Sequence, residues 1–509
     1  MADLKNPEDS LAQEVNASDE NTLVLHRSYS LFENFSTSFA ALYSVGGVRV
    51  TFKTGIAAGV PLAYWTTYIV TCVFTFITAA VIAEACSASP SAGSIYLWAA
   101  EAGGKRFGRL FGFIVAWWST TAWTTFCASN TQSAVNYMLS EMTVFDINFP
   151  TDVSNIKFHA VQWICTEVLL ALAALMNLAS GTLKYVFWFS TGAVFLDFIL
   201  NVVWLPIGAH NTFGMRTASE AFLTTYNGTG APAAGILIGF DASGHVAEET
   251  KNAAVNAAKG IFWSIAVSGV LGFSAVILFF LNFSSMGKKL TIWQPPIDVL
   301  FSYNAPQPFV PLYIALLDEG GHIVMNVLSV VALWLNTAIA ITAASRLVFA
   351  VARDGVLPLS GWVSRVSAEG QPRNAVLVVW GVAAVITCTI LPSAVAFTSL
   401  VSAAGVPSAA AYGLIGLGRL TLTSSEKLEA KWSLGRLSRS FQFISVLWNG
   451  WVAAVLFSPY LFPVEASTLN YAPIILGIAT IFALISWFFT PAPAWVPRGR
   501  LSRPVEDTE

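Results

Sequence analysis

The stretch that decides the fold is GFDASGHVAEET, residues 239–250. It places two glycines, a carboxylate and a histidine behind an apolar run and then ends in a pair of acids. A membrane-spanning helix accepts such residues where it breaks and its freed backbone groups line a protected cavity. In transporters built from inverted repeats, that cavity is the substrate site near the middle of the bilayer. The stretch therefore predicts a broken membrane helix, with a second break in the other half of the chain.

The composition is that of a membrane protein. The 509 residues are 55% hydrophobic and 11% charged, whereas about 25% of residues are charged in a typical soluble domain. Each apolar window exceeds the roughly 20 residues that a helix needs to cross about 30 Å of hydrocarbon. Windows without Asp, Glu, Lys or Arg lie at 54–83, 110–140, 260–287, 374–418 and 440–464.

Twelve membrane helices are predicted between two cytosolic tails. Residues 1–28 are polar and acidic and lack the basic start and apolar core of a cleaved signal, so a disordered tail is expected. Residues 491–509 are expected to form the second tail. Within the transmembrane domain, 29–490, the predicted spans are 31–56, 61–84, 108–138, 158–179, 185–208, 231–247, 259–283, 322–350, 374–391, 396–418, 441–461 and 470–490.

The positive charges give this topology an orientation. Twelve crossings put both termini on one side, where tails and loops hold 20 Lys and Arg residues against five on the other side. Because cytosolic loops carry the excess of Lys and Arg, both termini are predicted to be cytosolic. Two glycosylation sequons, at Asn227 and Asn282, fall on the predicted outer side.

The partner break is predicted in the first span, at SFAALYSVGGVR, residues 38–49. Gly46, Gly47 and a serine lie there in mid-membrane, although two glycines can also simply let helices approach closely. Interrupted helices in corresponding positions indicate an inverted repeat. The predicted fold is therefore an all-α polytopic membrane protein with a 5+5 inverted repeat, helices 1 and 6 broken and two added helices. The repeats cover about 29–208 and 231–418, and the added helices about 441–490.

Three separated stretches resemble one family. Residues 239–250, EACSASPSAGSIYLW at 84–98 and SRLVFAVARDGVLP at 345–358 are similar to signatures of fungal permeases in the amino acid, polyamine and organocation superfamily. The branch is that of amino acid, GABA and choline transporters, and the likeness covers about 29–490. It implies twelve helices, the leucine-transporter-type repeat, and uptake of amino acids or related amines, usually driven by protons.

The sixth helix departs from this pattern. Only the eight residues 231–238 stand between Gly230 and Gly239, and eight helical residues reach about 12 Å, short of the roughly 15 Å from interface to midplane. The outer half of this helix is therefore truncated, or it borrows the polar segment upstream.

The two breaks predict a site for a zwitterion. Backbone N–H groups at the start of the second half of helix 1 favour an anion and would hold a carboxylate. Carbonyls at the end of the first half of helix 6 would take an ammonium, and glycine lets the ligand approach the backbone. The predicted substrate-binding residues are Ser44, Val45, Gly46, Gly47, Ile238, Gly239, Phe240, Asp241 and Trp123.

Several of these polar residues have competing interpretations. Asp241 faces the ammonium, carries the coupling proton or caps the lower half of helix 6. His245 is either a packed histidine bonded to a neighbouring helix or a proton relay. Trp123 belongs to the aromatic stretch 117–126 and either cages a choline-like cation or only packs. In helix 8, residues 336–345 supply hydroxyls that are interhelical glue or the remnant of a sodium site.

The charges inside the spans raise further alternatives. Arg49 lies in the outer half of helix 1, where an unpaired charge costs roughly 2.5 to 3.5 kcal/mol on insertion scales. It either snorkels to the outer interface or pairs with a carboxylate of the protein or substrate. The remaining intramembrane acids, Asp197 and Glu167, either pair with polar neighbours or take part in proton coupling.

Opposite charges cluster at the predicted cytosolic mouth. They predict a gate of salt bridges that charge reversal at Arg353 would disturb, and the alternative is an ordinary positive-inside anchor. The coupling and gating candidates are therefore Arg49, Asp197, His245, Glu84 and Arg353, and the mouth also contains Arg346, Asp354, Glu248 and Glu249.

The predicted function is secondary active transport of an amino acid or related small amine by alternating access, with a proton as the coupling ion. The alternatives are a choline, GABA or polyamine carrier, and a non-transporting receptor-like or inactive paralogue with a shortened helix 6. We expect no enzyme activity, cofactor, metal or nucleic acid, because no phosphate loop, metal run or nucleophile with its base appears. The expected location is the plasma membrane, with the vacuolar or another organelle membrane as the alternative.

Overall fold

A computed structural model describes most of the chain, and the residues it describes form helices and connecting turns without a named strand. An isolated bridge joins Tyr29 to Thr250. The described residues are 29–91, 93–150, 155–179, 181–212, 217–223, 245–282, 305–367, 370–392, 396–423, 430–458, 469–491 and 495.

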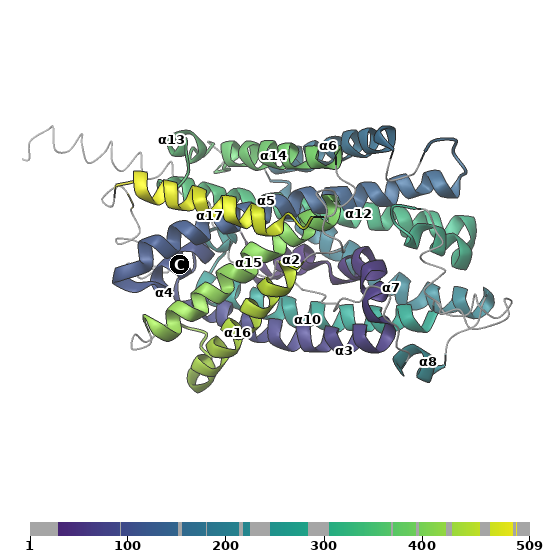
Figure 1. The fold of residues 1–509 in the computed structure, drawn as a ribbon, viewed down its shortest axis with the longest axis horizontal. Helices are drawn as coiled ribbons and strands as arrows, with labels where there is room; N and C mark the ends of the chain where they lie inside the picture. Colours follow the sequence, from purple (N-terminus) through teal and green to yellow (C-terminus); the bar gives the residue numbers. More distant parts are fainter. Residues whose placement is uncertain are drawn as a thin grey trace, which may run out of the picture.

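The long helices lie side by side along the long axis of the molecule (Figure 1). The α-helices are α2 (Leu31–Leu42), α3 (Ser44–Ala88), α4 (Ser94–Ala102), α5 (Gly104–Val144), α6 (Ile156–Leu178), α7 (Leu183–Thr212), α8 (Ala218–Leu223), α10 (Ala253–Asn282), α12 (Phe309–Arg353), α13 (Ser360–Val363), α14 (Arg373–Thr387), α15 (Ala396–Thr421), α16 (Ser438–Leu456) and α17 (Ala472–Phe489). Three short 3-10 helices are η1 (Ala247–Glu249), η3 (Cys388–Ile390) and η4 (Gly435–Leu437).

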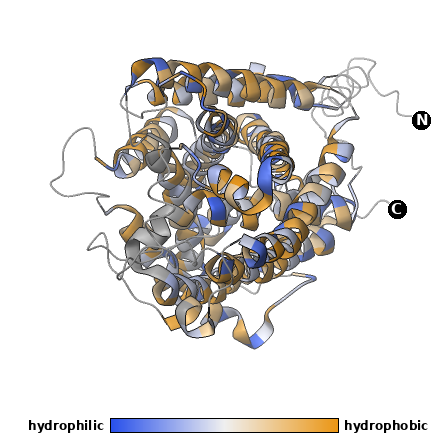
Figure 2. Cartoon of the chain, turned by 90° about the vertical axis from the view of Figure 1, so that its right-hand side faces the viewer, coloured by the Kyte–Doolittle hydropathy of each residue, from blue (hydrophilic) through white to orange (hydrophobic). Residues whose placement is uncertain are grey.

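Most predicted spans coincide with an observed helix to within several residues. The first span is divided between α2 and α3, and α3 continues through Pro61 into the second span. The sixth span, predicted at 231–247, lies almost wholly outside the described residues. Eight described helices are long and apolar enough to cross a membrane. Figure 2 shows apolar residues over the outward faces of the helices, as lipid contact requires.

Helix pairing reflects the inverted repeat. The helices of spans two, three and four, which are α3, α5 and α6, pack against α10, α12 and α14 of spans seven, eight and nine. Each helix thus contacts its counterpart five spans later, as a twofold relation between the halves requires. The packing of α7 on α12 has its mirror in the packing of α15 on α5. The all-helical 5+5 architecture is therefore observed as pairing between described helices.

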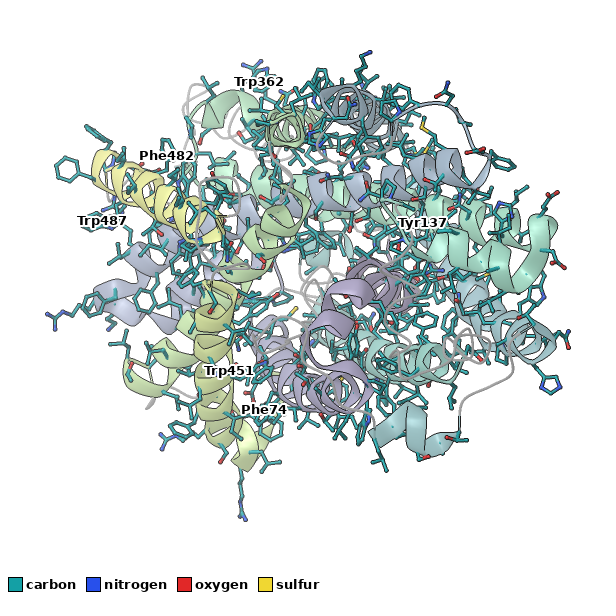
Figure 3. The ribbon with its side chains drawn as sticks, turned by 45° about the vertical axis from the view of Figure 1, so that its right-hand side comes forward. Phe74, Tyr137, Trp362, Trp451, Phe482 and Trp487 are labelled. Atoms are coloured by element: carbon teal, nitrogen blue, oxygen red, sulfur yellow. The ribbon has the colours of Figure 1, made fainter. Side chains whose placement is uncertain are left out.

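The two added helices attach to the bundle through aromatic side chains. On α16, Trp448 stacks on Phe74 of α3 at 5.0 Å between ring centroids and on Trp451 at 5.3 Å. On α17, Phe482 stacks on Trp117 of α5 at 5.5 Å. Figure 3 labels Phe74, Trp451 and Phe482 at these positions. Large apolar faces of both helices are exposed, which places them at the lipid-facing side of the bundle.

The start of α12 forms a cap over one end of the bundle. Asp318 has a non-helical backbone (φ 58°, ψ −176°) and divides residues 309–317, here named the cap segment, from the rest of α12. The cap segment packs with α3, α7 and α10 in one apolar cluster that contains Phe52, Leu205, Phe279 and Leu312.

Gly208 of α7 allows the cap segment to approach. A Cβ atom added at Gly208 would lie 2.3 Å from the Leu316 carbonyl oxygen, and a backbone atom cannot yield as a side chain does. We expect Gly208→Ala to lower the unfolding temperature of the detergent-purified protein, with a cost of about 1 to 3 kcal/mol for the overpacking. Gly192→Ala in the same helix is the control, because a Cβ atom there meets nothing within 4 Å. Equal unfolding temperatures for the two variants would contradict the close approach.

Candidate functional site

Helix 1 is broken at Tyr43. This residue lies between α2 and α3 with φ 32° and ψ 58°, in the left-handed region that costs a residue other than glycine roughly 1 to 2 kcal/mol. The prediction of a break in residues 38–49 is confirmed, but the break precedes the glycine pair. Gly46 is instead needed because a Cβ atom there would lie 2.3 Å from the Tyr43 ring.

The break frees carbonyl groups, and α12 supplies their partner. Asn336 Nδ2 donates to the carbonyl oxygens of Ala40 at 2.5 Å and Ala41 at 3.2 Å. Asn130 Nδ2 of α5 donates in turn to Asn336 Oδ1 at 2.5 Å. A buried backbone acceptor needs such a partner when water is excluded. Asn336, the first residue of the stretch 336–345, therefore links α12 to α2 and α5 through hydrogen bonds.

The N–H groups at the start of α3 differ in their availability. Gly47 N–H donates to the Tyr43 carbonyl at 2.9 Å, so this N–H group is not free to bind a substrate carboxylate. The first N–H groups of a helix have no acceptor within it. At this break those groups belong to Ser44, Val45 and Gly46, and they are the donors that the arrangement offers to an anion.

A cavity of about 170 Å³ opens beside the break. It is bounded by α2, α3, α5, α12 and α15, and it has aromatic and neutral polar walls. One buried hydroxyl on it, Ser44 Oγ, has no hydrogen-bond partner in the described part of the chain. The lining residues are Ala41, Leu42, Tyr43, Ser44, Gly47, Val48, Val50, Thr51, Tyr64, Tyr68, Thr71, Phe126, Ser129, Asn130, Ser133, Leu333, Asn336, Val401, Ala404 and Gly405.

The predicted site residues are only partly brought together. Ser44 and Gly47 line this cavity, whereas Val45, Gly46 and Trp123 lie outside its wall. The other predicted members, Ile238, Gly239, Phe240 and Asp241, lie outside the described residues, as does the break in helix 6.

Trp123 packs against His245. Their ring centroids are 5.4 Å apart with the planes at 87°, and His245 Nδ1 lies 2.8 Å from Ser94 Oγ. His245 is fully buried, so its geometry is that of a packed histidine bonded to a neighbouring helix. The aromatic wall of the cavity is built instead from Tyr43, Tyr64, Tyr68 and Phe126. Sequence reasoning missed the three tyrosines, although Tyr43 directly precedes the serine that was predicted to bind.

Arg49 is buried and paired with Asp197 of α7. Arg49 Nη2 lies 2.7 Å from Asp197 Oδ2 and Nη1 lies 2.9 Å from Oδ1, with both side chains fully buried. The guanidinium also lies 5.6 Å from the centre of the Tyr137 ring, which Figure 3 labels. The snorkelling interpretation of Arg49 is therefore wrong, and the partner is a carboxylate of the protein.

Three more side chains join this ion pair. The Tyr43 hydroxyl donates to Asp197 Oδ2 at 2.9 Å and accepts from Arg49 Nη2 at 2.9 Å. Arg49 Nη1 donates to the Tyr313 hydroxyl of the cap segment at 2.8 Å. Asn201 Nδ2 donates to Asp197 Oδ1 at 3.1 Å. We name Tyr43, Arg49, Asp197, Asn201 and Tyr313 the cap network.

A second buried ion pair lies near the other end of α12. Arg346 Nε lies 2.7 Å from Glu249 Oε1, and Arg346 Nη2 donates to Gln371 Oε1 at 2.8 Å. Tyr29 N–H donates to the Glu249 carbonyl at 2.7 Å. Burial and the nearby Glu249 carboxylate raise the pKa of the Tyr29 hydroxyl above its ordinary value. We name Arg346 and Glu249 the inner pair; it ties α12 to the segment that follows the sixth span.

Two predicted gate residues have other contacts. Glu84 accepts hydrogen bonds from Ser433 Oγ, Leu434 N–H and Ser438 Oγ at 2.6 to 2.9 Å, so it tethers the start of α16 to α3. Arg353 Nε lies 3.8 Å from Asp354 Oδ1, and its guanidinium lies over the Phe349 ring.

The structure also shows the positions of Glu167 and of the sequon residue Asn282. The Thr387 hydroxyl donates to Glu167 Oε1, so this intramembrane acid has a polar neighbour on α14. The Asn282 side chain is buried at the end of α10, which does not suit a glycosylation site, and Asn227 lies outside the described residues.

The inner pair generates a stability prediction. Arg346→Gln leaves the Glu249 carboxylate buried without its cation, which typically costs about 3 to 5 kcal/mol. We expect a large fall in the unfolding temperature of the purified protein. Arg353→Gln should cause a smaller fall, because the carboxylate in its ion pair lies 3.8 Å away rather than 2.7 Å. A larger fall for Arg353→Gln than for Arg346→Gln would contradict this assignment.

Comparisons with known proteins agree with this fold. The family model described as "Amino acid permease" matches residues 32–490. The chain is 45% identical over 506 residues to the thiamine transporter thi9 of Schizosaccharomyces pombe, covering 93% of this chain and 84% of the relative. It is 27% identical to the amino-acid permease BAT1 homolog of rice (Oryza sativa), covering 92% and 91%, and 25% identical to a putative polyamine transporter of Candida albicans, covering 95% and 88%.

Among solved structures, a manganese transporter of Eremococcus coleocola has a TM-score of 0.51 at 12% identity, covering 89% of this chain and 92% of that one. This likeness concerns the fold alone and confirms the leucine-transporter type that the family resemblance implies. The family match extends over nearly the whole described bundle, including the break at Tyr43 and both buried ion pairs. The chain therefore belongs to the amino acid permease family and is a multi-pass membrane transporter of the amino acid, polyamine and organocation superfamily.

Proposed function

We propose that this permease is a secondary active transporter of a thiamine-like organic cation, working by alternating access with a proton as the coupling ion. The observation that carries the proposal is the 45% identity, over 93% of the chain, with a relative named a thiamine transporter. The composition of the cavity beside the helix 1 break supports the same class of substrate. The expected amino acid or small amine is thereby narrowed to an amine that carries an aromatic ring.

The walls of the cavity suit a flat cation. Thiamine has a positively charged thiazolium ring and an aminopyrimidine ring, and aromatic faces attract cations. Tyr43, Tyr64, Tyr68 and Phe126 supply such faces, and the lining contains no charged residue among those described. The Ser44 hydroxyl has no partner in the described residues and is therefore available to the ring nitrogens or the amino group.

Arg49 is not available for a substrate carboxylate. Both of its Nη atoms already bond to Asp197, so an acidic substrate would depend on the N–H groups and hydroxyl at the start of α3. The carboxylate of a zwitterionic amino acid thus depends on those N–H groups and the Ser44 hydroxyl, whereas a thiamine-like cation has no carboxylate and uses the aromatic wall. This difference favours the cation over the amino acids and GABA as substrates.

Alternating access needs a closure at each end of the cavity. The cap network and the inner pair are candidates for these closures, since each contains a buried ion pair between segments that are far apart in the sequence. Asp197 is connected to the cavity through the hydroxyl of Tyr43, which makes it the candidate for proton coupling. We also propose that the protein lies in the plasma membrane with both termini in the cytosol.

Uptake measurements in a yeast strain without its own thiamine transport test the substrate. We expect radiolabelled thiamine to enter cells that express the chain, with a rate that falls when a protonophore collapses the proton gradient. Excess unlabelled thiamine should abolish the signal, and neutral amino acids, GABA, choline or spermidine should not. Entry of a labelled amino acid without entry of thiamine would contradict the proposed substrate, and no uptake of any of them would favour an inactive paralogue.

Ser44→Ala tests the cavity itself. Loss of one hydroxyl that bonds the substrate should raise the KM for thiamine about five- to tenfold and leave protein levels unchanged. Ser268→Ala is the matched control, because Ser268 Oγ is also buried without a partner in the described chain but lies outside the cavity wall. Equal KM values in the two variants would remove Ser44 from the site.

A further inference from the structure

The cap network connects two places with different roles. Tyr43 lines the cavity at the helix 1 break, and Tyr313 belongs to the cap segment. Both hydroxyls bond to the same guanidinium, that of Arg49, at 2.9 and 2.8 Å. A single buried ion pair therefore holds the wall of the cavity and the cap at one end of the bundle.

Stability alone does not explain a pair of this kind. Removing two charges from water has a large desolvation cost, and replacing a buried ion pair with apolar residues of similar volume is often neutral or stabilising. The Arg49 and Asp197 side chains are both fully buried. Apolar residues could fill the same space, but they could not form the hydrogen bonds by which the pair positions its neighbours.

Tyr43 is the neighbour that needs this support. Its backbone is left-handed, a strained conformation that persists where the surroundings hold it in place. Its ring packs over Gly46, and its hydroxyl bonds to both members of the ion pair. Without those two hydrogen bonds, the ring would be free to leave its place in the cavity wall.

We propose that Arg49 and Asp197 are positioning residues that hold Tyr43 in the cavity wall and hold the cap segment closed through Tyr313. Neither charge lines the cavity, so both act through the two tyrosines. A substrate that displaces the Tyr43 ring would weaken the hydrogen bond between Arg49 and Tyr313 of the cap segment. Opening of the cap segment would in turn weaken the hydrogen bonds that hold the Tyr43 ring. Substrate binding and access from the cap end are thereby coupled through one guanidinium. Of the two tests that follow, the one that measures the KM for thiamine rests on the proposed function, whereas the one that measures cysteine labelling does not.

The first test separates positioning from stability. Asp197→Asn and Arg49→Met each leave one buried group without its charged partner and should lower the unfolding temperature. The double variant R49M/D197L should recover most of that loss, yet raise the KM for thiamine at least about tenfold, as loss of hydrogen bonds to a charged group predicts. Tyr43→Phe, which keeps the ring, should raise the KM in the same direction. A double variant or a Tyr43→Phe variant with the parent KM would overturn the inference.

The second test needs no substrate. Gly47 lines the cavity and a Cβ atom there meets nothing within 4 Å, so Gly47→Cys places a reporter thiol in the wall. Its reaction rate with a charged methanethiosulfonate is measured on detergent-purified protein, with subtraction of the rate of the chain that lacks this cysteine. We expect Tyr313→Phe to raise the rate about tenfold.

The control is Tyr185→Phe, since Tyr185 is exposed on α7 and should leave the rate unchanged. The double variant R49M/D197L carries the same expectation as Tyr313→Phe, so the test stands even if one of them folds poorly. Parent rates in both would overturn the inference. If the parent chain takes up no thiamine but Tyr313→Phe accelerates labelling, the proposed substrate fails and the positioning role stands.

Discussion

Backbone groups that are freed in the middle of a membrane protein must find partners within the protein, and this constraint shapes the centre of the molecule. At Tyr43 the chain leaves the α-helix for one residue. Asn336 of the other repeat donates hydrogen bonds to the freed carbonyl oxygens of Ala40 and Ala41. Asn130 then orients Asn336. The cavity lies where these three elements meet, because a break leaves space that straight helices would fill.

Two buried ion pairs fix the structure on either side of this centre. Each joins two segments that are far apart in the sequence, and each includes a fully buried arginine. Arg346 lies ten residues beyond Asn336 in α12, about 15 Å along the helix. A transporter needs its two mouths to open in alternation, and paired charges suit this role since they are stable only when both partners are present.

The sequence predicted the architecture well, because membrane spans are read from long apolar windows that depend little on tertiary contacts. It also predicted the break in helix 1, since two adjacent glycines beside a serine weaken a helix in mid-membrane. Within that stretch the break lies at Tyr43 rather than at the glycine pair, because Tyr43 adopts a left-handed backbone that its own hydrogen bonds support, whereas residue type alone favours glycine. Gly46 is required by the Tyr43 ring, a contact that spacing does not reveal.

The charges were harder to interpret for a related reason. Arg49 and Asp197 are far apart in the chain, and only the packing of α3 against α7 shows that they meet. The signal was present, since a buried arginine requires a carboxylate and Asp197 was one of two intramembrane acids. The partner of Glu249 could not be chosen from the sequence, because Arg346 and Arg353 both lie in the last two turns of α12. Trp123 was chosen for its affinity for cations, but its ring packs against His245 outside the cavity wall.

The central claim is that the broken helix 1 forms the substrate cavity. An experimental structure of the full-length protein with thiamine tests it most directly. It should show ligand density between Tyr43, Ser44, Tyr68 and Asn130, with Tyr43 in a left-handed backbone and Arg49 on Asp197. Continuous α-helical hydrogen bonding through residues 39–47, or thiamine bound away from these side chains, would contradict the claim.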